Sequence, residues 1–193
     1  PVAGLGAGRM VMSHYSLLVE GQAQMFVAGP PVVAAVGEKR TKEELGGAAI
    51  HAANGAVDDV AASETEAFQK LRRFLSYLPA SVHELAAREA TKDRPDRTDA
   101  GLVEAIPRNP RHLYKIRPII ESVVDKGTFF EMGARHGQAI VTGFARMDGW
   151  PVAILASDPM TLGGLWTAAT ARKVERFVDL AEGRFERGVE LDG

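Results

Sequence analysis

A charged, proline-containing stretch near the middle of the chain limits the folds that this sequence can adopt. From residue 80 to about residue 112 the sequence is rich in charged residues, contains three prolines and has few large apolar side chains. A segment of this composition buries little apolar surface, so we expect it to be an exposed linker. The chain is therefore expected to form two lobes, at residues 1–79 and 113–193, joined by a linker at residues 80–112.

The first lobe carries short apolar runs and two helix-start signals. Apolar runs at residues 15–20 and 24–27 predict short buried strands. Capping-box patterns occur at Thr41–Glu44 and Ser63–Glu66, and the second precedes a helix that Pro79 ends. The apolar residues of that helix recur at helical spacing and predict one buried face. They are Ala67, Phe68, Leu71, Phe74, Leu75 and Leu78.

The second lobe shows a hairpin between two helical segments. Residues 116–127 have the pattern of an amphipathic helix, and residues 139–157 are two apolar runs joined by Asp148-Gly149, a strong hairpin signal. Residues 167–183 are again helical in pattern, with one apolar side. That side comprises Ala171, Val174, Phe177, Val178 and Ala181. Strands mixed with helices in both lobes predict an α/β architecture.

Composition excludes several classes of site. The net charge of −2 gives no general attraction to nucleic acid or to an acidic membrane, and the absence of cysteine excludes disulfides and thiolate sites. No apolar run approaches the length of a membrane span, so we expect a protein of the cytoplasm. None of the five histidines has the spacing of a metal-ligand pair. We therefore expect no metal, nucleic-acid or membrane site.

The opening sequence "PVAGLGAGRM" has glycines at positions 4, 6 and 8. A phosphate-binding P-loop requires Lys and then Ser or Thr after its last glycine, but Arg9 and Met10 follow here. The spacing also departs from the dinucleotide-binding pattern G-x-G-x-x-G. Two interpretations remain from the residues alone. One is a tight turn between core elements, and the other is a turn whose amides stabilise a developing oxyanion.

Several longer motifs occur together, in order, from Pro1 to about Glu182, and only the linker interrupts them. They are "PVAGLGAGRMVMSHYSLLVEGQAQMFVAGPPVV", "KEELGGAAIHAANGAVDDVAASETEAFQKLRRFLSYLP" and "IIESVVDKGTFFEMGARHGQAIVTGFARMDGWPVAILASDPMTLGG". On these motifs the sequence resembles the carboxyltransferase (beta) subunit of biotin-dependent acyl-CoA carboxylases, of the propionyl-CoA and acetyl-CoA type.

The resemblance implies a crotonase-like fold of ββα units wound into a superhelix, with parts of two such domains in this chain. Residues 1–79 correspond to the C-terminal part of the domain on the acyl-CoA side. Residues 113–193 correspond to the start of the domain on the carboxybiotin side. The implied partners are a biotin carboxylase or biotin carrier subunit and further copies of the chain, in a trimer or hexamer.

The resemblance also implies a mechanism and its site residues. Carboxybiotin on a partner carrier domain supplies a carboxyl group to the α-carbon of an acyl-CoA, without a metal, through an enolate held by backbone N–H groups. Those groups belong to the glycine-rich turn, Gly4, Leu5, Gly6 and Ala7. The residues implied on the biotin side are Asp158, Pro159, Met160, Gly163 and Gly164.

Some features depart from the family pattern. Gly4-Leu5-Gly6 stands where the family more often has Gly-Gly, and Ser157-Asp158-Pro159 where it more often has Asn-Gln-Pro. The chain begins within the first domain, and its polar end at residues 183–193 resembles nothing in the family, so we expect a fragment that is inactive alone. Two alternatives are a decarboxylase subunit, which moves the carboxyl group from acyl-CoA to biotin, and a non-catalytic remnant of the fold.

Overall fold

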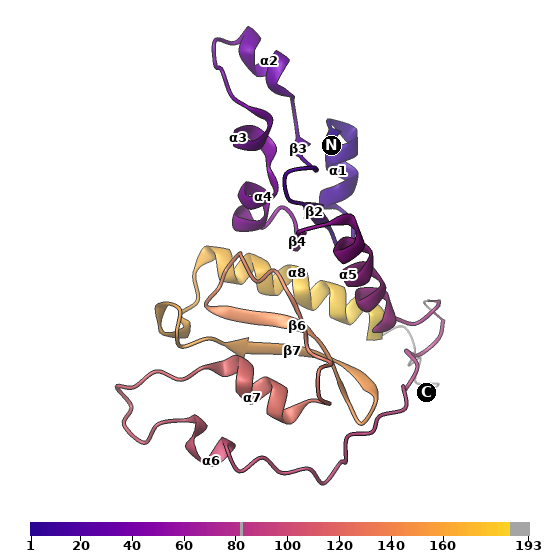
Figure 1. The fold of residues 1–193 in the computed structure, drawn as a ribbon, viewed down its shortest axis with the longest axis vertical. Coiled ribbons are helices and arrows are strands. Elements are labelled where there is room, and N and C mark those ends of the chain that lie inside the picture. The colour runs from indigo at the N-terminus through magenta and orange to yellow at the C-terminus, as the bar shows by residue number, and fades with distance from the viewer. Residues whose placement is uncertain (82, 186–193) are drawn as a thin grey trace, which may run out of the picture. The chain divides into compact units, whose positions relative to one another are not determined.

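The computed structural model describes residues 1–81 and 83–185, with side chains described as far as Glu182. The polar end of the sequence from residue 186 lies outside the described residues. The chain forms two compact units, which Figure 1 shows as ribbons. Unit 1 consists of residues 1–72 and 133–136, and unit 2 of residues 73–132 together with the chain from residue 137.

Unit 1 is built from short parallel strand pairs and short helices. Strand β1 (Val2–Ala3) pairs with β3 (Met25–Phe26), and β2 (Leu17–Val19) pairs with β4 (Asp59–Ala61). β2 and β3 confirm the two expected strands. The helices are α1 (Leu5–Val11), α2 (Pro30–Ala35), α3 (Lys42–Gly46), α4 (Ala48–Asn54) and the start of α5 (Glu64–Ser76).

The core of unit 1 is small and aliphatic. Its buried members come from α1, the strands, α4 and the turn after α4, and small residues allow these short elements to approach closely. The capping box at Thr41 is confirmed, since the Glu44 amide donates to the Thr41 hydroxyl while the Glu44 carboxylate accepts from the Thr41 amide. The buried core residues are Ala7, Leu18, Met25, Ala48, Ala52, Val57 and Val60.

Unit 2 contains an antiparallel sheet of three strands in the order β5-β6-β7. The strands are β5 (Phe130–Met132), β6 (Ile140–Met147) and β7 (Trp150–Ser157). Asp148 and Gly149 connect β6 to β7 with φ values of 50° and 78°. Two consecutive positive φ values are what a two-residue hairpin turn requires, which confirms the expected hairpin.

Helices cover both faces of this sheet (Figure 1). Helix α7 (Ile116–Val123) packs Ile120 against Val141 and Ala145 of β6. Helix α8 (Ala168–Phe185) packs on the other face, where the Phe177 ring lies 5.4 Å from the ring of Phe144. The remaining elements of unit 2 are the end of α5, the short helix α6 (Leu102–Ala105) and the 3-10 turn η1 (Leu162–Gly164).

Two expected apolar faces differ from the observed ones. On α5 only Phe74 is buried, whereas Phe68, Leu71 and Leu75 are 59%, 39% and 54% exposed. On α8 the buried face is rotated from the expected one, since Ala171 is exposed. The buried residues of α8 include two polar ones and are Thr170, Lys173, Val174, Phe177 and Leu180.

Candidate functional site

The glycine-rich turn joins β1 to α1 in unit 1. Gly4 is the N-cap of α1 and has φ 56°, a conformation that glycine adopts without strain. At Gly6 an added Cβ would meet Val2 at an ordinary 3.5 Å, and at Gly8 it would meet nothing within 4 Å. The positive φ therefore favours glycine at position 4, whereas packing within the chain leaves room for a Cβ at positions 4, 6 and 8.

Three backbone amides of this turn point out of the start of α1 without an acceptor in the helix. The N–H groups of Leu5, Gly6 and Ala7 lie in the first helical turn, where no carbonyl precedes them by one turn. The Gly8 amide is the first with such an acceptor, the carbonyl of Gly4 at 3.1 Å. Ala7 is buried in the core, which fixes the start of α1, while Leu5 is exposed.

Gly4 is also expected among the amide donors, and its amide has an acceptor within the chain. Its N–H donates to the carbonyl of Phe26 at 3.1 Å and extends the pairing of β1 with β3. A hydrogen-bonded amide of this kind is occupied, so the candidate donors are reduced to Leu5, Gly6 and Ala7.

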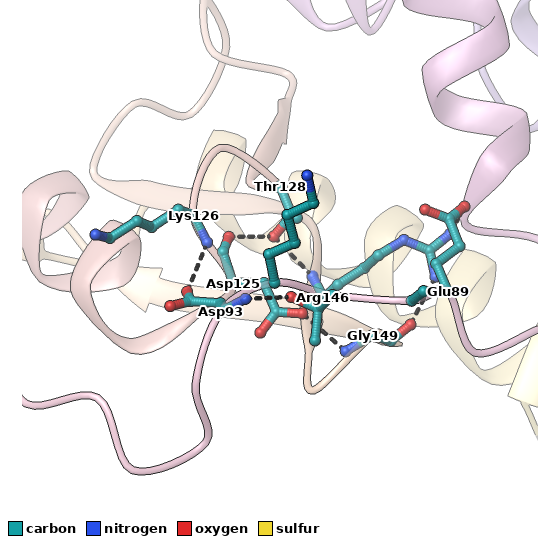
Figure 2. Close-up of a pocket in the computed structure, with 10 residues that line it drawn as sticks. Glu89, Asp93, Asp125, Lys126, Thr128, Arg146 and Gly149 are labelled. Carbon is teal, nitrogen blue, oxygen red and sulfur yellow. Dashed lines mark hydrogen bonds and ion pairs between the residues drawn. The ribbon is translucent and has the colours of Figure 1, made fainter.

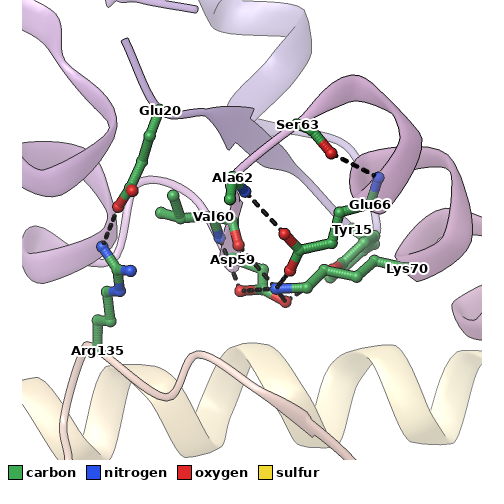
Figure 3. A network of polar contacts seen from close by, with 9 residues as sticks. All are labelled: Tyr15, Glu20, Asp59, Val60, Ala62, Ser63, Glu66, Lys70 and Arg135. Atoms are coloured by element: carbon green, nitrogen blue, oxygen red, sulfur yellow. Dashed lines mark hydrogen bonds and ion pairs between the residues drawn. The ribbon is translucent and has the colours of Figure 1, made fainter.

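A polar network fixes β4 against α5 in unit 1 (Figure 3). Asp59 accepts from the Tyr15 hydroxyl at 3.1 Å and from Lys70 Nζ at 3.0 Å. Burial raises the pKa of Tyr15, and the charge of Asp59 raises it further, so this hydroxyl remains a donor. The neighbouring Asp58 accepts instead from the amide of Ser16 at 2.8 Å. The two carboxylates thus have separate structural partners.

The candidate biotin-side residues lie in the segment after β7 in unit 2, residues 158–164, which we call the post-β7 loop. The buried Asp158 carboxylate accepts from Arg117 Nη1 at 2.5 Å and from the Met160 amide at 3.0 Å. Gly163 and Gly164 have φ values of 63° and 75° and turn the chain toward α8. Pro159 and the half-exposed Met160 lie between them and Asp158.

Arg117 connects this loop to the sheet. Its Nε and Nη2 atoms form a bidentate pair with Glu131 of β5, at 2.8 and 2.6 Å, while Nη1 reaches Asp158. The pKa of Arg117 is raised mainly by the hydrogen bonds to Glu131 and then by Asp158, against the opposing effect of burial. Sequence reasoning missed Arg117 and Glu131. The only available signal was a charged residue inside each of the apolar runs "IRPII" and "FFEM".

Lys173 is a further buried cation that the sequence analysis missed. Its ammonium donates to the carbonyl of Ile140 at 2.7 Å, on the face of β6 that α8 covers. Burial lowers the pKa of Lys173 to about 8, and the charge of Arg117 acts in the same direction, against Glu131.

A separate cavity in unit 2, of about 390 Å³, lies where the segment after α5 meets the β6–β7 hairpin (Figure 2). Several of its charged groups are paired within unit 2. Arg146 donates to Glu89 and to the carbonyl of Gly149, and Asp125 accepts from the Gly149 amide at 2.7 Å. Asp93 accepts from the Lys126 amide at 3.0 Å. These contacts attach Glu89 and Asp93, which belong to the expected linker, to the rest of unit 2.

Residues 1–81 and 83–185 were searched for groups of metal ligands and for helices that could span a membrane. Within these ranges no group of three His, Asp or Glu side chains could hold an ion. His51 lies instead beside the carbonyl of Met25, and His136 beside that of Ala53. The helices of the same ranges are too short or too polar to cross a bilayer.

Comparisons with known proteins agree on one family. Residues 1–185 match the family described as carboxyl transferase domain. The chain is 34% identical to the propionyl-CoA carboxylase beta chain of Roseobacter denitrificans, over 92% of this chain and 35% of that protein. It is 32% identical to the methylmalonyl-CoA decarboxylase subunit alpha of Veillonella parvula, with the same coverage. The chain thus spans about 35% of the length of these relatives.

Solved structures show the same likeness. The hexameric transcarboxylase 12S, with hydrolysed methylmalonyl-CoA bound, matches 94% of this chain and 36% of its own chain with a TM-score of 0.88 and 28% identity. A single-chain, multi-domain long-chain acyl-CoA carboxylase matches 94% of this chain and 18% of its own with a TM-score of 0.78 and 26% identity. The expected crotonase-like α/β fold is confirmed. The chain belongs to the carboxyl transferase domain family of biotin-dependent carboxylases and decarboxylases.

Proposed function

We propose that this chain forms part of a carboxyltransferase that moves a carboxyl group between biotin and the α-carbon of an acyl-CoA thioester. The observation that carries the proposal is the group of three first-turn amides at Leu5, Gly6 and Ala7. Glycine at positions 6 and 8, where packing does not require it, leaves this surface open to a ligand. Backbone amides fixed in this way are suited to stabilise an oxyanion.

The chemistry needs such donors at one step. Carboxybiotin, held by a partner carrier domain, supplies the carboxyl group. The N–C bond of carboxybiotin would break first, and the freed ureido nitrogen would take the proton of the thioester α-carbon. The electron pair of the C–H bond would then pass to the thioester oxygen as an enolate. Amides of Leu5, Gly6 and Ala7 would donate to that oxygen. The α-carbon of the enolate would then form a C–C bond to the released carboxyl carbon.

The post-β7 loop is proposed as the biotin side. It combines glycine backbone at positions 163 and 164 with the exposed apolar side chains of Met160 and Leu162, which are 50% and 66% exposed. Such a surface suits a ring that offers an apolar face and amide groups. We further propose a homo-oligomer, a trimer or hexamer, and a biotin carboxylase or carrier subunit as partners. On this account the 193-residue chain alone transfers little or no carboxyl group.

Labelled carboxyl transfer tests the proposal. Residues 1–185 replace the matching segment of the Roseobacter denitrificans beta chain, and this chimaera is incubated with carboxyl-labelled methylmalonyl-CoA and free biotin. Label should move to biotin while propionyl-CoA forms in equal amount, because a proton replaces the lost carboxyl group. Incubation with carboxybiotin that carries the label would test the reverse direction, which places label in the α-carboxyl group of the acyl-CoA.

Two controls make the assay decisive. The unaltered beta chain shows that the conditions support transfer, and the mass of the chimaera shows whether it assembles as the relative does. A chimaera that assembles and binds acyl-CoA but transfers no label would contradict the proposal. Transfer by the 193-residue chain alone would contradict the expected need for the remaining sequence.

A further inference from the structure

We infer that Arg117 is a positioning residue, which fixes the post-β7 loop through its ion pair with Asp158 and thereby determines how well unit 2 binds biotin. The effect of Arg117 on the loop follows from the contacts of this chain, whereas its effect on biotin binding rests on the proposed function. Asp158 stands where the family that the sequence resembles more often has glutamine, so the ion pair with Arg117 departs from that pattern.

Asp158 depends on Arg117 for the compensation of its charge. The carboxylate is buried, and the described part of the chain places Arg117 as its only ion-pair partner, at 2.5 Å. Arg117 is itself oriented by the bidentate pair with Glu131 of β5. A planar guanidinium held at two of its nitrogens presents the third in a fixed direction. The sheet thus sets the position of Arg117, and Arg117 sets that of Asp158.

Asp158 in turn organises the loop. Its carboxylate accepts from the Met160 amide at 3.0 Å, and its main-chain carbonyl accepts from the Thr161 amide at 3.1 Å. The Thr161 carbonyl then accepts from the Gly164 amide at 2.9 Å. These bonds run in series, so a displacement of the carboxylate is transmitted to the glycines at the end of the loop.

The loop conformation needs this restraint. Leu162, Gly163 and Gly164 have φ values of 49°, 63° and 75°, and for leucine a positive φ is unfavourable. A residue persists in such a conformation only where its surroundings hold it there. The turn is also close-packed, since a Cβ on Gly164 would lie 3.2 Å from the Cβ of Ser157. A loop released from Asp158 would therefore relax away from this shape.

Arg117→Gln tests the inference by hydrogen exchange on the chain itself. Exchange at the amides of Met160, Thr161 and Gly164 should become faster by about tenfold or more, because the buried carboxylate loses its counter-charge. Arg88→Gln is the matched control. It makes the same substitution at an Arg–Asp pair, with Asp148, in which both side chains are about half exposed. That variant should leave the loop amides unchanged.

A second variant keeps the test valid if Arg117→Gln destabilises unit 2. Asp158→Asn retains an oxygen for the Met160 amide and leaves no buried charge. In this background Arg117→Gln should add less than about twofold to loop exchange, because the two residues act through one contact. Equal effects of Arg117→Gln with and without Asp158 would overturn the inference, as would unchanged exchange in the single variant. Arg117→Lys, which keeps the charge but not the bidentate geometry, should restore part of the protection.

Kinetics of the chimaera test whether the conformation of the post-β7 loop affects biotin binding. Arg117→Gln should raise the KM for free biotin by about tenfold and leave the KM for methylmalonyl-CoA unchanged. The reason is that a loosened post-β7 loop affects only the proposed biotin side. Faster loop exchange with an unchanged biotin KM would overturn the role in biotin binding. A parent chimaera with no transfer would contradict the proposed function instead, and hydrogen exchange would still decide whether Arg117 positions the loop.

Discussion

Replacing Arg146 by methionine should release residues 87–89 from the rest of unit 2 and lower the free energy of unfolding of unit 2. The Arg146 side chain is 5% exposed, and its guanidinium lies 5.4 Å from the centre of the Tyr77 ring. It donates hydrogen bonds to the last residue of α5, to the segment that follows α5 and to the β6–β7 hairpin. The acceptors are the carbonyls of Ser76 (2.6 Å), Ala87 (3.2 Å) and Gly149 (2.8 Å) and the carboxylate of Glu89 (2.6 Å).

The expected loss of unfolding free energy follows from the hydrogen bonds and charge compensation that each partner of Arg146 loses. A hydrogen bond to a charged group contributes about 1.5–3 kcal/mol, but the sum is offset by the cost of burying the guanidinium. Removing one member of a fully buried pair costs about 3–5 kcal/mol. Glu89 is 55% exposed and would be hydrated when released, so the cost should be smaller. We expect a loss of about 2–4 kcal/mol.

The measurement is denaturant unfolding of unit 2 combined with hydrogen exchange at the Glu89 amide, which donates to the Gly149 carbonyl at 3.0 Å. Limited proteolysis should also cut faster within residues 80–92. Arg88→Met is the control, because the pair of Arg88 with Asp148 is exposed on both sides and should cost less than about 1 kcal/mol. Equal losses in the two variants, or an unchanged Glu89 amide, would refute this reasoning.

Two further predictions concern unit 2. Burial lowers the pKa of Lys173 from 10.5 to about 8, so between these pH values the unfolded state binds more protons. From pH 8 to 10.5 the unfolding free energy of the parent should therefore rise relative to that of Lys173→Met, by at most about 3 kcal/mol. A difference between the two proteins that stays constant across this range would disprove this prediction. Gly149→Ala should destabilise more than Gly127→Ala in thermal unfolding. Both glycines have positive φ, but only a Cβ at position 149 would clash with the Glu89 carbonyl. Equal shifts in melting temperature would show that this contact is unimportant.

Local patterns in the sequence were sufficient for the elements whose geometry is set by near neighbours. The hairpin follows from Asp148-Gly149, because two residues with positive φ match the twist of the flanking strands. The capping box at Thr41 joins groups three residues apart. The turn at Gly4 likewise depends on a single residue with positive φ, although the short strand before it and the helix after it were not predicted. In each case the interacting groups are close in the chain.

Features that depend on distant residues were not predictable. Arg117 and Asp158 are far apart in the sequence, and only the order of the strands brings them together. Lys173 is buried because its ammonium reaches a carbonyl of β6, whereas the apolar pattern of α8 counted only aliphatic and aromatic residues. The occupied amide of Gly4 depends on the parallel pairing of β1 with β3, which the spacing of glycines does not encode.

The transfer rate of Gly6→Pro compared with that of Gly6→Ala in the chimaera tests the central claim most directly. Both variants add a Cβ, which would meet Val2 at an ordinary distance, but only proline removes the amide hydrogen. Proline breaks no helical hydrogen bond in the first turn, and α2 of this chain already begins with Pro30 and Pro31. If the Gly6 amide holds the enolate, Gly6→Pro should be slower by about a hundredfold or more, with unchanged acyl-CoA binding and thermal stability. Equal rates in two folded variants that bind acyl-CoA would contradict it.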